Sequence, residues 1–101
     1  MAYGRLCGAR LCIVNIGELR MRIIDTERGQ SVRCLQLYLT VREAIELRQQ
    51  MERLLADPES NEHFHVHSDD ASRELSCSIV TARKLGQGSY TALERRVFDE
   101  E

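Results

Sequence analysis

Three histidines alternate with apolar residues in the stretch His63-Phe64-His65-Val66-His67, which holds every histidine of the chain. Such alternation is typical of a β-strand with one face in a core, so Phe64 and Val66 are predicted to point inward and the imidazoles outward. Imidazoles bind transition metals and change charge near neutral pH. The chemistry predicted for this face is metal binding or a proton-sensitive contact, and an ordinary solvated strand is the third interpretation.

A metal site on this strand needs a further ligand. Residues two apart on a strand stand roughly 6.6 Å apart on the same side, so two imidazoles converge on one ion more readily than three. A carboxylate on the neighbouring strand is the natural addition. In one antiparallel register Glu74 faces His67 and Ser76 faces His65; in a register shifted by two residues, Glu74 faces His65 instead. The predicted ligands for Zn²⁺ or another transition metal are His63, His65, His67 and Glu74, and the loop residues Asp69 and Asp70 are further oxygen donors.

One helix carries signals for both of its ends. Thr40 and Glu43 form a T-x-x-E capping box, whose hydroxyl and carboxylate accept hydrogen bonds from amides that a helix start leaves unpaired. Asp57-Pro58 ends the helix, because the residue before a proline is pushed out of the α region. The charged side is interpreted as solvated. Apolar residues at three- and four-residue intervals predict one buried stripe, made of Val41, Ala44, Ile45, Leu47, Met51, Leu54 and Leu55.

The hydrophobic period changes to two on both sides of this helix, which predicts four strands. They are 19–23, 32–39, 63–67 and 73–80, joined in two hairpins by a turn at 27–30 and the polar loop 68–72. The element order is ββαββ and the fold class α+β, with an antiparallel sheet of about four strands and the main helix on one face. Thr91 and Glu94 repeat the T-x-x-E spacing and predict a short C-terminal helix. Residues 83–89, which include two glycines, are interpreted as a flexible loop.

Residues 1–20 differ from the rest, since they hold three of the six glycines, two of the four cysteines and a single acid. They are predicted to be an N-terminal extension or an extra strand at 11–16, ahead of a single domain over 21–101. Gly17-Glu18 would be encoded by a purine-rich run of the kind that bacterial ribosomes use to initiate, two codons before Met21. A native start at Met21 is therefore a hypothesis beside that of a real N-terminal strand.

Composition favours a soluble globular protein, with 43% hydrophobic and 30% charged residues. The formal net charge of -2 argues against non-specific nucleic-acid binding, which takes an excess of Lys and Arg. No apolar run approaches the roughly 20 residues that span a bilayer or the length of a secretory signal, so a cytoplasmic location is expected. Free thiols are expected there. Cys34 and Cys77 are predicted to act as small buried hydrophobes, and Cys7 and Cys12 have a spacing that is weak support for zinc.

The chain resembles a group of short uncharacterised bacterial proteins over residues 21–98. The similarity lies in the run Leu37-Tyr38-Leu39-Thr40, the Glu43-Ala44 pair of the helix, the H-x-H element and Arg73-Glu74-Leu75. The resemblance implies a ββαββ pattern and an origin in the bacterial cytosol. It implies no activity.

Three functions follow as hypotheses. The first is a non-enzymatic binding or regulatory module that forms a homodimer or binds another protein, because one helix covers only one face of an open sheet and Val32, Tyr38 and Val80 would lie on the other. The second is a transition-metal-binding protein that uses the histidine strand with Glu74. The third is a small metal-dependent hydrolase with a metal-activated water. No nucleotide-binding or hydrolase motif adds a catalytic or cofactor-binding residue.

Overall fold

A computed structural model describes residues 19–100. Contacts between residues divide the chain into two compact units. One unit contains the chain up to Leu35 together with the residues from Gln87 on, and the other is Gln36–Gly86. The predictions made for residues 1–18, including an extra strand and the Cys7 and Cys12 pair, lie outside the described residues.

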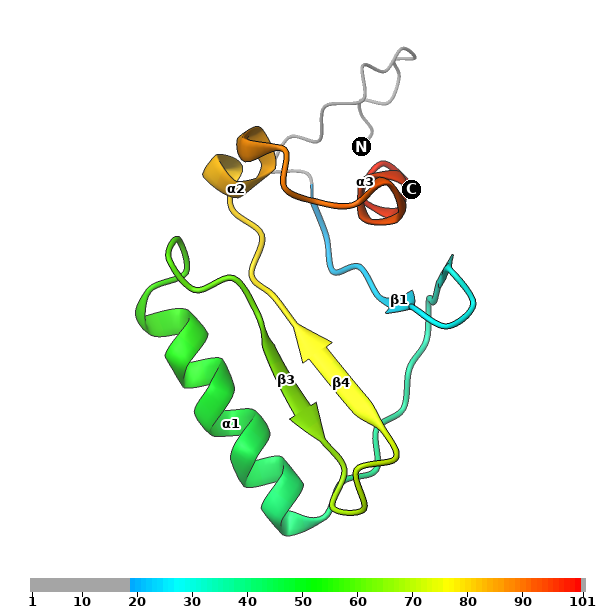
Figure 1. The fold of residues 1–101 in the computed structure, drawn as a ribbon, viewed down its shortest axis with the longest axis vertical. Helices are drawn as coiled ribbons and strands as arrows, with labels where there is room; N and C mark the ends of the chain where they lie inside the picture. Colours follow the sequence, from blue (N-terminus) through cyan, green and yellow to red (C-terminus); the bar gives the residue numbers. More distant parts are fainter. Residues whose placement is uncertain (1–18, 101) are drawn as a thin grey trace. The chain divides into compact units, whose positions relative to one another are not determined.

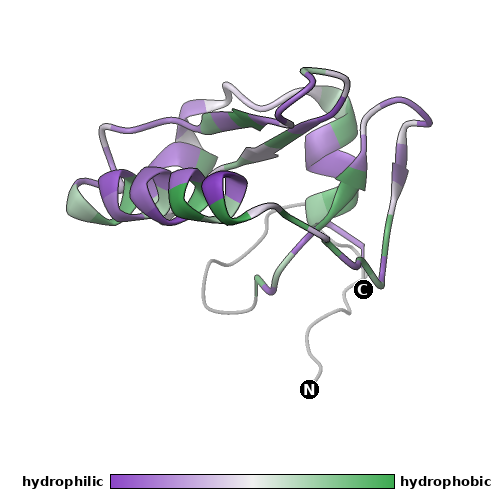
Figure 2. Cartoon of the chain, turned by 90° about the horizontal axis from the view of Figure 1, so that it is seen from below, coloured by the Kyte–Doolittle hydropathy of each residue, from purple (hydrophilic) through white to green (hydrophobic). Residues whose placement is uncertain are grey.

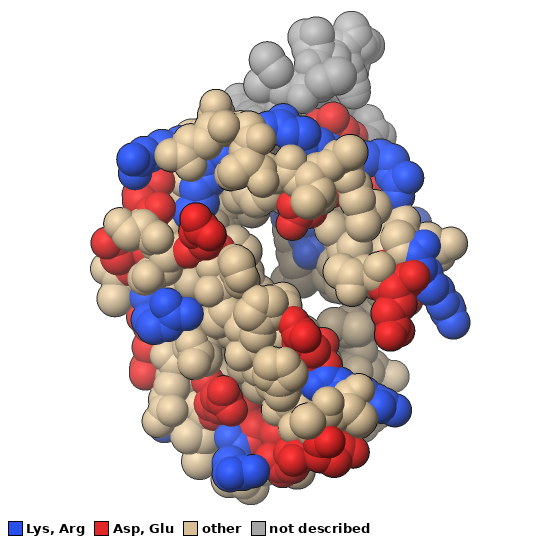
Figure 3. Space-filling view, in the orientation of Figure 1, with Lys and Arg blue, Asp and Glu red and all other residues tan. Residues whose placement is uncertain are grey.

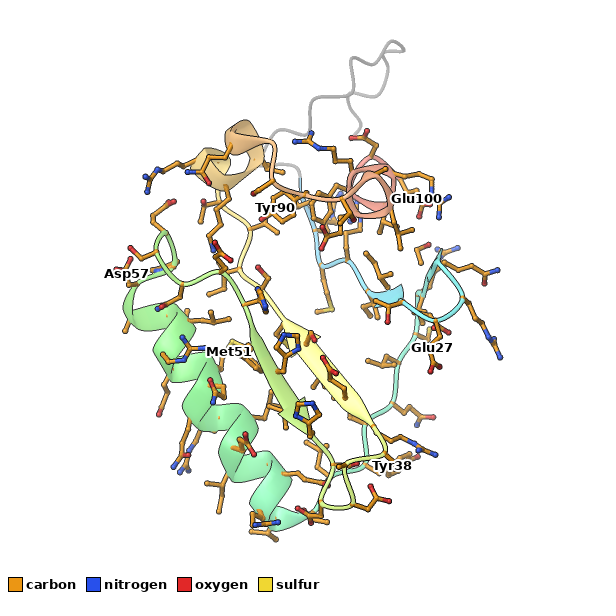
Figure 4. The ribbon with its side chains drawn as sticks, viewed as in Figure 1. Glu27, Tyr38, Met51, Asp57, Tyr90 and Glu100 are labelled. Carbon is orange, nitrogen blue, oxygen red and sulfur yellow. The ribbon has the colours of Figure 1, made fainter. Side chains whose placement is uncertain are left out.

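The unit Gln36–Gly86 is built on one helix and one hairpin. Its elements are α1 (Val41–Ala56), β3 (Phe64–His67), β4 (Glu74–Cys77) and most of α2 (Ala82–Gln87). β3 and β4 pair antiparallel, and α1 packs along β3 (Figure 1). The core of this unit consists of the buried residues Leu54, Phe64 and Val66 with Leu47, Met51, Cys77 and Ile79 packed against them. Figure 4 shows Met51 between α1 and the hairpin.

Both ends of α1 lie where the sequence predicts them. The side chain of Thr40 accepts a hydrogen bond from the backbone of Glu43, and the Glu43 carboxylate accepts one from the backbone of Thr40, so the capping box is complete. The helix ends at Ala56, and Asp57 before the proline is its C-cap. Local signals therefore set the length of this helix.

The single apolar stripe predicted for α1 is wrong. Leu47, Met51 and Leu54 face the core, whereas Val41, Ile45 and Leu55 are 78%, 41% and 62% exposed. The two groups lie on different sides of the helix, because 100° of rotation per residue places them about a third of a turn apart. The helix buries one of these sides against β3.

The loop predicted over 83–89 is also wrong, since Ala82–Gln87 forms α2. The Thr81 hydroxyl accepts a hydrogen bond from the amide of Lys84 at 3.2 Å and so supports the start of this helix. The Lys84 ammonium is buried and donates to the carbonyl oxygens of Asn61 and Ile79 at 2.7 and 2.9 Å. Gly88, with a φ of 73°, follows the end of the helix and allows the left-handed turn there.

The other unit contains a short hairpin and a capped helix: β1 (Ile24–Asp25), β2 (Gln30–Ser31) and α3 (Ala92–Phe98). The carboxylate of Asp25 accepts hydrogen bonds from the amides of Glu27 and Arg28 and closes the turn. Thr91 and Glu94 form a second complete capping box, which confirms the predicted C-terminal helix. Val97 and Phe98 of this helix are buried.

The fold class is mixed α+β, and the order ββαββ is confirmed. In the described residues the four strands form two separate two-stranded sheets, β1-β2 and β3-β4. The predicted bounds of the first hairpin are wrong: residues 19–23 precede β1, and no strand runs over 32–39. Beyond β1 and β2, a backbone hydrogen bond from the amide of Val32 to the carbonyl of Ile23 joins the two segments. Within residues 19–100, no helix is long and apolar enough to cross a membrane.

The two cysteines of the described residues are free thiols. Cys34 is exposed, so the prediction that it acts as a buried hydrophobe is wrong. Cys77 lies in β4, half-buried against the core, where burial raises the pKa of its thiol. The sequence predicts an apolar, buried environment for both Cys34 and Cys77, and only Cys77 is packed against the core.

Candidate functional site

The β3-β4 hairpin places the predicted site residues on one polar face. Phe64 and Val66 are buried on the inner side of β3, whereas His65 and His67 are exposed on the outer side. The register pairs His65 with Ser76 and His67 with Glu74, which is the first of the two registers considered from the sequence. Alternation therefore brings imidazoles and a carboxylate together across the two strands.

Glu74 connects two of the histidines. One of its carboxylate oxygens contacts Nδ1 of His65, and the other lies 3.6 Å from Nε2 of His67. The hydroxyl of Ser76 donates to the Glu74 carboxylate at 3.1 Å and lies 2.7 Å from the same Nδ1 of His65. His65, Ser76 and Glu74 thus share hydrogen bonds in one small group.

The imidazole rings follow one another along the strand. The rings of His63 and His65 meet edge to face with centroids 4.8 Å apart, and those of His65 and His67 stack at 6.5 Å. His63 precedes β3 and is exposed. All four predicted ligands therefore lie on one face, with His65 in the centre.

The environment of Glu74 stabilises its charged form. The hydrogen bond from Ser76 lowers the pKa of the Glu74 carboxyl most, followed by the hydrogen bond with His65 and by the charges of His65 and His67. The side chains of His65, Glu74 and His67 are 45%, 47% and 57% exposed, so water reaches the whole group.

The group is not arranged as a nucleophile relay. In a Ser-His-acid triad the hydroxyl and the carboxylate bind opposite nitrogens of the imidazole, so that the ring can pass a proton between them. Here Ser76 and Glu74 both contact Nδ1 of His65. The His65 ring therefore cannot pass a proton between Ser76 and Glu74 through its two nitrogens in this geometry.

Asp69 and Asp70, predicted as further oxygen donors, have other partners. The Asp69 carboxylate accepts hydrogen bonds from the Thr40 hydroxyl and the Arg42 guanidinium, each at 3.0 Å. Asp70 accepts from the hydroxyls of Ser68 and Ser72 and from the Ser72 amide, and these bonds hold the pKa of its carboxyl well below its usual range. Neither carboxylate joins the histidine group.

No three His, Cys, Asp or Glu side chains within residues 19–100 converge in an arrangement that could hold a metal ion. The transition-metal site and the metal-dependent hydrolase remain predictions from the residue types.

A second surface, which the sequence interpretation placed in the core or in a strand, lies on α1 and the segment before it. Leu37, Tyr38 and Leu39 are 48%, 85% and 40% exposed and lead directly to the helix cap. We call the exposed set the apolar surface; it consists of Leu37, Tyr38, Leu39, Val41, Ile45 and Leu55. Hydrophobic and hydrophilic segments both run along α1 in Figure 2. The four- and three-residue spacing from Val41 onward is the sequence signal for this second side.

The apolar second sheet face predicted around Val32, Tyr38 and Val80 is not formed, since all three residues lie outside the four strands. The outer face of β3-β4 is polar instead.

The chain matches no protein-family model, no curated protein and no solved structure.

Proposed function

We propose that the protein is a non-enzymatic bacterial binding or regulatory module that acts as a homodimer. The observation that carries this proposal is the apolar surface, whose most exposed members are Tyr38 at 85% and Val41 at 78%. Several large apolar side chains exposed by a small domain are a recurrent feature of protein-protein contacts. Burial of this surface against a second chain would remove it from water.

The proposal of binding rather than catalysis draws on the shape of the histidine face. His65 and Glu74 are both nearly half exposed on a short hairpin, and Ser76 shares the nitrogen that Glu74 occupies. Catalytic sites generally hold their reacting groups in a concave, water-excluding pocket. An open face of this kind is better suited to contact a partner and to respond to protons.

A protein partner is favoured over nucleic acid by the charges. The formal net charge is -2, and positive and negative side chains are interspersed on the face that Figure 3 shows. Phosphate backbones are bound by concentrated Lys and Arg. We place the protein in the cytoplasm, where the free thiols of Cys34 and Cys77 would be maintained.

Light scattering on the tag-free chain tests the proposal. The wild type should have the mass of a dimer at high concentration and shift toward the monomer on dilution. Tyr38→Ser should weaken this association, because it removes the most exposed aromatic ring of the apolar surface. Gln36→Ser, a change at an exposed polar neighbour, is the matched control and should keep the wild-type mass. A monomer at every concentration would overturn the proposal.

The histidine face favours transition-metal binding as a second candidate function. The specific observation is that Glu74 contacts both His65 and His67, so two imidazoles and a carboxylate, the ligand types that transition metals prefer, are neighbours on this face. Calorimetric titration of the tag-free protein with Zn²⁺ should then show binding that His65→Gln and Glu74→Gln each weaken at least tenfold. The Cys34→Ser variant controls for binding by the exposed thiol. Equal affinity in the wild type and both site variants would contradict a metal role for this face.

A further inference from the structure

The exposed side of α1 carries a regular line of residues. Val41, Ile45, Arg48, Glu52 and Leu55 follow one another at alternating intervals of four and three, and all five are exposed. We call this line the outer ridge. Core contacts of the helix come from a different side, through Leu47, Met51 and Leu54. The outer ridge is therefore free to contact a second molecule without any change in the fold.

The spacing of the outer ridge is that of a coiled-coil seam. An average of 3.5 residues keeps a line of side chains facing a partner helix along its whole length. Val41 and Ile45 lie at one end of the ridge and Leu55 at the other, with Arg48 and Glu52 between them. A partner helix must therefore offer apolar groups at both ends and opposite charges in the middle.

We infer that this partner is α1 of a second copy of the chain, packed antiparallel across a two-fold axis. With the axis between Arg48 and Glu52, Arg48 of each chain lies opposite Glu52 of the other. The same register places Ile45 opposite Leu55 at both ends. Parallel packing would instead place Arg48 against Arg48 and Glu52 against Glu52. Charge thus selects the antiparallel pair, whose closed two-fold symmetry is the commonest in oligomers.

The two central charges are available for such pairs. In the described part of the chain, neither Arg48 nor Glu52 takes part in an ion pair or a side-chain hydrogen bond. Within one helix an acid placed four residues before a base pairs better than the reverse, and here the base comes first. Contacts within the chain therefore compete little with the pairing of Arg48 and Glu52 to a second chain.

The size of this contact predicts its strength. α1 has 16 residues and is about 24 Å long, so the ridge alone covers little more than two heptads. Standard protein interfaces bury about 1,600 Å² in total. Leu37, Tyr38 and Leu39 precede α1, so they would add apolar area at each end of an antiparallel pair. We expect a dimer that dissociates on dilution.

This inference rests on the proposed homodimer and names the surface that forms it. The test is analytical ultracentrifugation of the full chain from micromolar to millimolar concentration. Arg48→Glu and Glu52→Arg should each weaken the dimer at least tenfold, because each puts like charges opposite one another. Glu46→Arg is the matched control for Glu52→Arg: it makes the same change of residue and charge on the same helix at an exposed position off the ridge. It should leave the dimer unchanged.

An equimolar mixture of the Arg48→Glu and Glu52→Arg chains should recover the association, because opposite charges then meet at both central positions. Recovery also shows that both variants are folded. A dimer that Glu52→Arg and Glu46→Arg affect equally, or a mixture that does not recover, would overturn the outer ridge as the interface while leaving the homodimer in place. A wild-type monomer throughout the range would overturn both.

Discussion

Glu43 ties the first turn of α1 to the turn between β3 and β4. One oxygen of its carboxylate accepts a hydrogen bond from the amide of Thr40 at 2.8 Å, and the other accepts from the amide of Asp69 at 2.7 Å. Glu43 itself is buried. The same carboxylate thus completes the helix cap and fixes the turn that follows the histidine strand.

Glu43→Gln should lower the free energy of unfolding by about 1–3 kcal/mol. The amide side chain keeps one oxygen, so one of the two backbone N–H groups loses its acceptor and faces an NH₂ group. Chemical denaturation measures this change. Glu46→Gln, on the exposed side of the same helix, should shift the free energy by less than about 0.5 kcal/mol. Equal effects of the two substitutions would mean that the Glu43 bonds add no stability.

Thr40→Ala should cost roughly 1 kcal/mol of stability, because it removes the hydroxyl that accepts from the amide of Glu43 at 3.1 Å. Thr40→Ser keeps that hydroxyl and should stay close to the wild type. Thermal unfolding followed by circular dichroism compares the two. Identical melting temperatures of the Ala and Ser variants would show that α1 does not depend on its cap.

Most of the fold features that the sequence could predict depend on residues that lie close together in the chain. Thr40 with Glu43 and Thr91 with Glu94 both form capping boxes, since cap geometry depends on residues three positions apart. The inward and outward faces of β3 and β4 were predictable, because a slip by one residue would expose Phe64 and bury the imidazoles, but two registers that differ by two residues remained open. These features need no knowledge of distant parts of the chain.

Features set by tertiary packing were not predictable in the same way. α1 has apolar residues on two sides, and only the position of β3 decides that Leu54 is buried while Leu55 is exposed. The segment before α1 alternates as a strand would, but no strand within residues 19–100 pairs with it. At the candidate site, the position of Glu74 on the same face as the histidines followed from alternation. The hydrogen bonds that direct Asp69 to Thr40 and Arg42 depend on the fold of the whole unit.

Asp70→Asn should destabilise the protein at neutral pH and have a smaller effect in acid. The hydrogen bonds from Ser68 and Ser72 hold the folded-state pKa of Asp70 below the ordinary value of 3.8. A depressed folded-state pKa gives stability that is present above the unfolded-state pKa and is lost as the pH falls through the folded-state pKa. The difference in melting temperature between wild type and variant should therefore shrink as the pH is lowered below about 4. A constant difference from pH 7 to pH 2 would contradict the role of the Asp70 charge.

Arg22 holds the C-terminal end of α3 to the chain before β1. Its guanidinium donates to the carbonyl oxygen of Val97 at 3.0 Å, of Phe98 at 3.4 Å and of Glu100 at 2.6 Å. The last carbonyls of a helix lack partners within the helix and carry partial negative charge. A planar cation with several donors reaches two of these groups, on Val97 and Phe98, together with the carbonyl of Glu100 just beyond the helix.

Arg22→Lys should therefore lower the free energy of unfolding by about 1.5–3 kcal/mol although the positive charge is kept. A single ammonium group cannot reach all three carbonyl oxygens as the planar guanidinium does. The amides of α3 should also exchange with solvent faster, since the end of the helix opens more often. Denaturant titration and hydrogen exchange measure the two effects. Arg28→Lys is the control: the Arg28 side chain is 77% exposed and lies 3.8 Å from Asp25, so its replacement should change little. If Arg22→Lys and Arg28→Lys had the same small effect, the carbonyl contacts of Arg22 would not hold α3 in place.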